Sequence, residues 1–446
     1  MAPPRLSIHP PLLNTACPWA TSADDLAALL ACPSTGAVTT RTSLLRGFAH
    51  DDAVHRYAFL DGHNNRTTTT TTISGNKNSN NYNYNYNDND NNATTITSSS
   101  NGSNTMSDDG PDSNEKTGLG RSTGTITTSG GGAVSSINSF GYSPHNLEYY
   151  LSAVQALSAK RQQQQHPGAR RTKTVIVSVT GSPGEVAECY ARILAVSLGG
   201  GAGAAAAASS PTRLHQSTTT TTSFTTQTPS QHPRDSQSPC RRGPPTPPPL
   251  PLPLPLAMEI NLSCPNIPGL SPPGYPSSSS ASSSSPSSSS SLGGSSSSSS
   301  LRAFLAALPR EPLIPIGIKL PPYTYAEQIS SLGATLRDFA ATLSFVTATN
   351  TLGMCVAGGV QGGLAGEALH PLALGNVTAL RRMLDSSSNN EVLRHIAVLG
   401  VGGVVDAQGY RRMREAGAEA VGLATALGVH GVDVFRKIER QLGSEW

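Results

Sequence analysis

The chain has 446 residues with 31 Lys and Arg against 28 Asp and Glu, and a formal net charge of +3 gives no basic footprint for nucleic acid. No window reaches the roughly 18 apolar residues of a membrane span, and the first residues lack the pattern of a secretory leader. Six cysteines without a CxxC pair do not indicate a disulfide-rich secreted domain. We therefore expect a soluble, cytoplasmic protein.

Three low-complexity tracts interrupt the sequence, at about 62–132, 199–257 and 272–300. The first is rich in Thr and Asn, the second passes from Gly and Ala through Thr into a Pro-Leu ladder, and the third is mostly Ser. Such compositions bury too little apolar surface to offset chain entropy, so we expect these tracts to be disordered. Removing them leaves about 290 residues, a length that suits a single (β/α)8 domain of roughly 250 residues.

In chain order, the remaining segments alternate between strand-like and helix-like patterns. A strand at 12–16 precedes a helix at 22–32, for which Ser22 is a suitable N-cap. A second strand at 36–40 is followed, after the first tract, by a helix at 145–160 whose apolar residues recur every three or four positions. Six further units pair strands at 174–180, 257–263, 314–320, 343–349, 395–403 and 418–426 with helices at 184–198, 301–308, 325–340, 371–384, 407–417 and 432–442.

Eight short apolar strands that alternate with helices predict a parallel sheet covered on its outer face, closed as a (β/α)8 TIM barrel. In such barrels, functional groups lie at the carboxyl ends of the strands, and phosphate is often bound after strands seven and eight. Glycines at 400–403 and the segment 423–428 occupy those two places and can offer backbone N–H groups to an anion. Taken singly, each is also consistent with an ordinary turn. Together they favour a phosphate-bearing cofactor, and no GxGxxG motif indicates a Rossmann site.

Polar residues at the other strand ends predict a binding site for a planar anion. Lys319 ends an apolar strand, where a buried ammonium needs negative charge nearby. Asn138, Asn261, Asn266 and Asn350 are each compatible with a turn, but four amides at one barrel mouth supply the paired donors and acceptors that suit an amide-rich ring with a carboxylate.

Cys264 lies among these asparagines, after the fourth strand. A thiol can act as a general base or as a nucleophile once its environment favours the thiolate. Because no histidine is placed beside Cys264 by the local sequence, proton abstraction is the preferred role and a Cys-His hydrolase is the alternative. The segment HDDAVH at 50–55 offers no second group of ligands, and we expect no metal site.

Several strand-end motifs together resemble those of dihydroorotate dehydrogenases of the soluble class 1A, fumarate-type family. These are EINLSCPNIPG, GIKLPPY, INSFG, TATNTLG, GGLAGEALHPLALGNV, VLGVGG and VGLATAL. The resemblance implies FMN in the barrel mouth, oxidation of (S)-dihydroorotate to orotate in pyrimidine (UMP) biosynthesis, fumarate as electron acceptor and a homodimer. It does not imply a nucleic-acid or membrane partner.

The resemblance also implies a role for each matching residue. Cys264 would remove a proton, assisted by Ser263, while a hydride passes to flavin N5. The residues expected to bind substrate are Arg41, Asn138, Gly141, Asn261, Asn266, Asn350 and Thr351. Those expected to contact FMN are Ala16, Ser43, Lys319, Gly362, Gly363, Gly402, Gly403, Ala424 and Thr425, with Lys319 stabilising the charge of the reduced flavin.

Some positions depart from the family pattern and keep two alternatives open. Arg41 stands where the family has a lysine, Phe140 replaces a methionine, Tyr142 replaces an aliphatic residue, and Cys17-Pro18 follow Ala16 in place of Ser-Gly. One alternative is therefore the oxidation of a related dihydropyrimidine. Another is a barrel that has lost turnover and binds partners, with its Pro-Leu ladder as a polyproline II ligand. The electron acceptor, fumarate or NAD or another, is also open.

Overall fold

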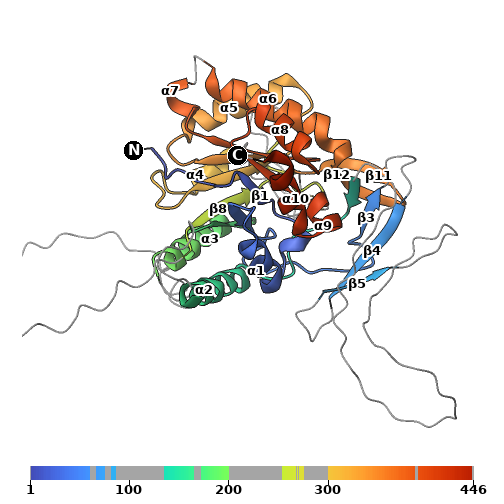
Figure 1. Cartoon of the computed structure of the whole chain (residues 1–446). Coiled ribbons are helices and arrows are strands. Elements are labelled where there is room, and N and C mark those ends of the chain that lie inside the picture. Colours follow the sequence, from blue (N-terminus) through green and yellow to red (C-terminus); the bar gives the residue numbers. More distant parts are fainter. Residues whose placement is uncertain are drawn as a thin grey trace, which may run out of the picture.

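Eight parallel strands form the centre of the molecule (Figure 1). They are β1 (Leu12–Asn14), β2 (Ala37–Thr39), β7 (Thr174–Val179), β8 (Leu256–Asn261), β9 (Ile316–Leu320), β10 (Phe345–Ala348), β13 (Ala397–Val401) and β14 (Ala420–Leu423). The sheet closes in the order β1-β14-β13-β10-β9-β8-β7-β2. The TIM barrel and all eight of its strands were predicted correctly.

The computed structural model describes residues 2–60, 67–75, 82–86, 135–164, 172–199, 254–267, 269, 271–275, 300–386 and 390–443, with backbone only at 67–75, 82–86, 162, 164 and 390.

Helices surround the barrel (Figure 1). Eight of them follow the predicted positions: α1 (Ala23–Ala31), α2 (Leu147–Gln164), α3 (Pro183–Ser197), α4 (Leu301–Ala306), α5 (Ala326–Asp338), α6 (His370–Asp385), α8 (Ala407–Glu415) and α10 (Asp433–Leu442). Short elements add α7 (Asn390–Leu393), α9 (Thr425–His430), η1 (Pro18–Ala20) and η3 (Glu367–Leu369). Ser22 caps α1 as expected, since its hydroxyl accepts from the Asp25 N–H at 3.0 Å. None of the helices described combines the length and the apolar composition that a bilayer-spanning helix needs.

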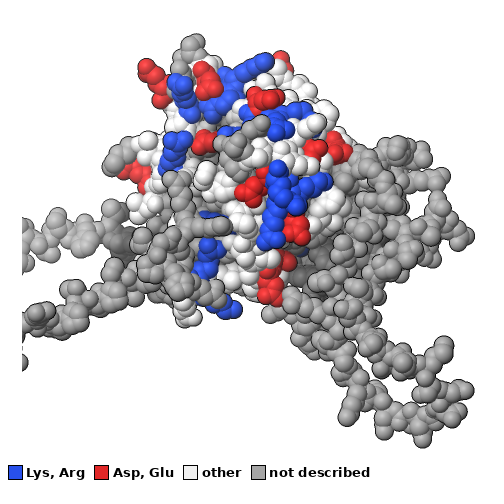
Figure 2. All heavy atoms as spheres, in the orientation of Figure 1, with Lys and Arg blue, Asp and Glu red and all other residues white. Residues whose placement is uncertain are grey.

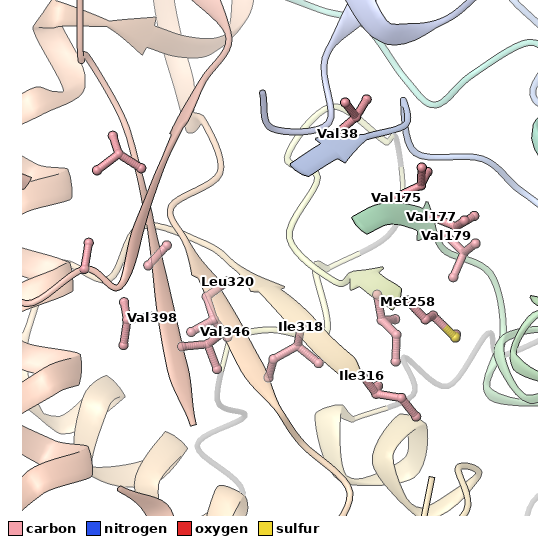
Figure 3. Packing of buried hydrophobic residues seen from close by; sticks show 14 of the residues in the cluster. Val38, Val175, Val177, Val179, Met258, Ile316, Ile318, Leu320, Val346 and Val398 are labelled. Atoms are coloured by element: carbon pink, nitrogen blue, oxygen red, sulfur yellow. The ribbon is translucent and has the colours of Figure 1, made fainter. Parts of the chain in front are cut away.

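The hydrophobic core has two layers because successive side chains of a strand point to opposite faces. Outward-facing residues such as Val177, Ile318 and Val346 pack toward the surrounding helices (Figure 3). The barrel interior holds a separate cluster that includes Ile176 and Phe345. A Cβ at Gly317 would lie 2.3 Å from the Phe345 ring, so the glycine makes room for the one aromatic side chain of this inner cluster.

A second sheet, which the sequence did not predict, flanks the barrel (Figure 1). It contains β3 (Tyr57–Leu60), β4 (Thr67–Gly75), β5 (Tyr82–Tyr86), β6 (Ser135–Asn138), β11 (Leu352–Ala357) and β12 (Val360–Gly366). The strands pair antiparallel in the order β11-β12-β6-β3-β4-β5. Their register sets Tyr57, Asn138 and Gly363 side by side. The sheet thereby carries Asn138 to the barrel mouth.

The predicted boundaries of the low-complexity tracts need correction in three places. β4 and β5 lie within the first tract, where β-branched Thr and aromatic Tyr favour extended backbone. The end of the Pro-Leu ladder enters the barrel, since Leu256 begins β8. Residues 272–275 are also ordered, with the Gly274 N–H bonded to Leu262 O at 2.8 Å. The rest of the tracts lies outside the described residues, so their disorder stays a prediction.

Basic and acidic side chains are interspersed over the described part of the surface in Figure 2. This mixing agrees with 31 basic and 28 acidic residues in the whole chain.

Candidate active site

A deep cleft opens at the carboxyl ends of the barrel strands. Its empty volume, open space at the mouth included, is about 1010 Å³, at the upper end of the roughly 300–1,000 Å³ of small-molecule sites. Fourteen of the residues predicted for the site line it: Ala16, Arg41, Asn138, Gly141, Asn261, Cys264, Asn266, Lys319, Asn350, Thr351, Gly402, Gly403, Ala424 and Thr425. Strand ends from around the barrel and β6 of the second sheet thus bring together residues far apart in sequence.

Four predicted site residues do not line the cleft. Ser263 is buried behind it, donating to Asn261 Oδ1 at 3.2 Å and accepting from Asn350 Nδ2 at 3.0 Å. Ser43 is also fully buried, and its backbone bonds tie the end of β2 to β7. Ser263 thus holds two amides, and the hydroxyl of Ser43 has no hydrogen-bond partner among the described residues. Their expected contacts with the thiol and the flavin stay predictions.

Gly362 and Gly363 are the other two, and both serve close packing on β12. A Cβ at Gly362 would lie 2.0 Å from the Asn138 carbonyl oxygen, and one at Gly363 would lie 2.1 Å from Thr351 Oγ1. Their expected place along the approach to the flavin stays a prediction. The two glycines let β12 lie against residues that do line the cleft.

The asparagines hold one another in fixed orientations. Asn266 Nδ2 donates to Asn138 Oδ1 at 3.2 Å and to the Phe140 carbonyl at 2.9 Å. In a second pair, Asn350 Nδ2 donates to Asn261 Oδ1 at 3.2 Å. An amide whose nitrogen is already engaged cannot rotate freely, so each presents a defined edge to a bound ligand.

Lys319 is a buried cation, only 4% exposed, at the end of β9. Its Nζ donates to Thr15 Oγ1 at 3.2 Å. Within the described part of the chain, no carboxylate forms an ion pair with it. Since a buried ammonium without a counter-ion is destabilising, an anion bound in the cleft would stabilise Lys319.

Cys264 is partly buried at the start of the loop after β8. Burial raises the pKa of its thiol, while the backbone N–H of Asn266 and the positive charges of Lys319 and Arg41 oppose that rise. A thiolate is thus disfavoured by desolvation and favoured by its neighbours. Cys17 also lines the cleft, and burial raises its pKa to about 12, so that thiol stays protonated.

The glycine turn after β13 has a conformation that other residues rarely adopt. Gly402 has φ of 137° and Gly403 has φ of 72°. A Cβ at Gly402 would lie 2.5 Å from Ala373 Cβ, and one at Gly403 would lie 2.6 Å from His370 Cβ. Only glycine fits at both positions, because any side chain there would collide with α6. Both glycines also line the cleft.

Sequence reasoning missed several cleft residues. Thr349 Oγ1 is buried and has no hydrogen-bond partner among the described residues. Its place in TATN, one residue before Asn350, is a signal that could have revealed it. Trp19 and Tyr57 form an aromatic wall, with ring centroids 5.1 Å apart. Tyr57 comes from the second sheet, and no motif pointed to it.

Phe140, at the same wall, positions the cation of Arg41, whose guanidinium carbon lies 5.4 Å from the Phe140 ring centroid. Among the described residues, no three His, Cys, Asp or Glu side chains are grouped so as to hold a metal ion.

Comparison with known proteins supports the resemblance. Residues 253–445 match the family model for dihydroorotate dehydrogenase. The dihydroorotate dehydrogenase (fumarate) of Trypanosoma cruzi (strain CL Brener) is 27% identical over 197 residues, covering 42% of this chain and 53% of that protein. The protein of the same name from Saccharomyces cerevisiae (strain ATCC 204508 / S288c) is 26% identical over 196 residues, covering 41% and 52%.

A solved structure, ligand-free type DHODH from Eimeria tenella, aligns over 69% of this chain and 68% of that chain, with 15% identity and a TM-score of 0.42. The chain spans about half the length of the curated relatives it matches. The matched family region contains Cys264, Lys319 and Asn350 and begins after Arg41 and Asn138. The family resemblance of the motifs is thereby confirmed for the second half of the chain.

Proposed function

We propose that this protein is an FMN-dependent dihydroorotate dehydrogenase, an oxidoreductase that converts (S)-dihydroorotate to orotate in pyrimidine biosynthesis with fumarate as electron acceptor. The observation that carries the proposal is one cleft in which Cys264, two hydrogen-bonded pairs of asparagines and the buried cation Lys319 lie together. That combination offers a base, a set of oriented amides and an anion site to one planar ligand.

The residues present fit FMN in three respects. The backbone of Gly402 and Gly403 lines the cleft, so a phosphate could lie against it. Lys319 supplies a buried positive charge for an anionic ring, and Thr349 Oγ1 is a buried polar atom without a partner in the described residues. When bound, FMN would take up the hydride of dihydroorotate and pass the electrons to fumarate.

In the substrate half of the cleft, the chain's own groups would orient and deprotonate the ring. The asparagines would hold the ring amides, and Arg41 would pair with the carboxylate. The Cys264 thiolate would take the proton from the carbon next to the one that loses hydride. Ser263 would keep Asn261 and Asn350 in register through its two hydrogen bonds.

We further propose a single catalytic domain with three insertions, acting in the cytoplasm as a homodimer. The edge strand β11 exposes Met354 and Val356, at 86% and 66%, which supports association through this side of the second sheet. To test the domain proposal, residues 277–298 would be replaced by a short Gly-Ser linker. An unchanged melting temperature is expected, whereas loss of folding would contradict it.

A spectrum tests the function most simply. The purified protein should carry flavin absorbance, or the apoprotein should gain melting temperature when FMN is added. If neither occurs, the protein is not an FMN oxidoreductase, and a binding or scaffold role takes its place.

Oxidation of a related dihydropyrimidine is the second candidate, favoured by the aromatic surroundings of Arg41. Phe140 packs over its guanidinium at 5.4 Å. The two candidates are distinguished by the carboxylate, which dihydroorotate has and dihydrouracil lacks. Flavin reduction by dihydroorotate alone supports the first candidate, and flavin reduction by dihydrouracil alone supports the second.

A further inference from the structure

His370, the first residue of α6, is 7% exposed and lies behind the glycine turn. Its Nδ1 is 2.7 Å from the carbonyl oxygen of Gly402, and its Nε2 is 3.1 Å from Nε of Arg412. A carbonyl oxygen can only accept and a guanidinium can only donate. The imidazole is therefore neutral, with its proton on Nδ1 and a lone pair on Nε2.

This contact fixes the direction of the next backbone N–H. In a trans peptide, the carbonyl of one residue and the N–H of the next point in opposite directions. The Gly402 carbonyl is turned back toward His370, so the Gly403 N–H is turned the other way, toward the cleft that both glycines line. In the described part of the chain, no group accepts a hydrogen bond from that N–H.

Because two glycines are adjacent here, the orientation of the peptide between them has to be fixed by a neighbouring group. With φ values of 137° and 72°, this peptide has few steric barriers to reversal. Reversal would point the Gly402 carbonyl dipole into the cleft, where it would repel an anion. Arg412 donates a hydrogen bond to Nε2 and thereby keeps the imidazole of His370 in this orientation.

We propose that His370 and Arg412 are positioning residues for a phosphate monoester: they clamp the Gly402–Gly403 peptide so that its N–H faces the phosphate of the bound flavin. The inference rests on the proposed function, because FMN is the ligand whose phosphate the turn would hold. The motif resemblance gave His370, which lies outside the cleft, no role in binding the cofactor.

Comparing FMN with riboflavin isolates this role, since riboflavin has the same ring and side chain but no phosphate. Dissociation constants of the full-length apoprotein for both would be measured by quenching of flavin fluorescence. His370→Leu should weaken FMN binding by about tenfold, the effect of one charge-assisted hydrogen bond, and leave riboflavin binding unchanged. His370→Asn, whose Nδ2 occupies nearly the place of imidazole Nδ1, should restore FMN binding to within about threefold.

Arg412→Gln should weaken FMN binding by roughly threefold, because the ring then loses one of its two anchors. Arg436→Gln is the matched control: it removes the same charge from a residue that pairs with Asp433 at 3.2 Å on α10, and should change neither constant. If His370→Leu does not fold, the Asn and Arg412 variants still give the comparison.

Two results would overturn the inference and leave the proposed function standing. One is an equal weakening of FMN and riboflavin binding, and the other is unchanged FMN binding in His370→Leu and Arg412→Gln. A wild-type protein that binds neither flavin would remove both. Weakening confined to FMN is the expected result.

Discussion

Asn261 on β8 donates a 3.0 Å hydrogen bond from Nδ2 to the hydroxyl of Thr42. Thr42 pairs with Ser178 at 3.0 Å, and Ser178 donates to the buried carboxylate of Glu259 at 2.9 Å. Because the carboxylate oxygen can only accept, each hydroxyl in this chain has one direction, and the nitrogen of Asn261 must face Thr42. Its oxygen is consequently turned toward Ser263. A carboxylate inside the barrel thus orients an amide in the cleft.

Thr42→Val should therefore weaken substrate binding without affecting the flavin. The substitution keeps the shape of the side chain and removes the hydroxyl that fixes Asn261. We expect the dissociation constant for dihydroorotate to rise by about fivefold to tenfold, the value of one buried hydrogen bond. Titration of the FMN-loaded protein measures it. Thr335→Val on α5, away from the cleft, is the control. Equal dissociation constants for dihydroorotate in the two variants would contradict the role of Thr42 in orienting Asn261.

Cys264→Ala should slow flavin reduction by dihydroorotate at least about 100-fold at neutral pH, the contribution of a positioned general base. Stopped-flow absorbance measures the reduction directly. Cys355→Ala is the matched control, because Cys355 lies on β11 and does not line the cleft. A variant without Cys264 that reduces its flavin at the normal rate would exclude this thiol as the base.

The pH dependence follows from the raised pKa of Cys264. Burial is the main cause, so near neutral pH the thiol is mostly protonated and only the small thiolate fraction can take a proton. We expect the rate of flavin reduction to rise by about tenfold per unit between roughly pH 6 and 8.

The same raised pKa makes the stability of the folded protein fall as the pH rises, whereas the rate of flavin reduction increases. The native state holds the Cys264 proton more tightly than the unfolded state does. This contribution to the free energy of unfolding is therefore fully present below the unfolded pKa of about 8.5 and is lost as the pH rises above it. Cys264→Ala should reduce this alkaline loss of melting temperature. A reduction rate that falls with rising pH would contradict the assignment.

Lys319→Met should have opposite effects on the empty and the loaded protein. In the apoprotein it removes a buried cation with no ion pair in the described residues, and the melting temperature should rise by roughly 2–6 °C. With FMN present, the stabilisation by the cofactor should shrink, because the buried charge that meets the anionic ring is gone. Differential scanning fluorimetry with and without FMN checks both. A lower melting temperature of the apoprotein would show that Lys319 is structural.

The barrel could be predicted from the sequence because its strands are short apolar runs at regular intervals, each followed by a helix. Strand ends such as Lys319 and Cys264 were found for the same reason, since parallel strands direct their carboxyl ends to one mouth. The second sheet could not be predicted in this way. Its central strand β6 pairs with β3 from before the first tract and with β12 from far along the chain, and such long-range pairing leaves no local pattern.

The placement of individual site residues could not be predicted for a similar reason. Ser43 and Gly363 belong to motifs that reach the cleft, but both pack behind the residues that line it, and their contact with the flavin stays a prediction. Thr349 was overlooked although it directly precedes Asn350, because the motif does not show that its hydroxyl is buried without a partner in the described residues. His370 joins the glycine turn only through tertiary packing of α6.

Anaerobic mixing of the FMN-loaded protein with (S)-dihydroorotate tests the central claim most directly. The account predicts that the flavin absorbance bleaches and that one equivalent of orotate appears per flavin, after which fumarate restores the absorbance. Flavin that stays oxidised with excess dihydroorotate at every pH from about 6 to 9 would contradict it.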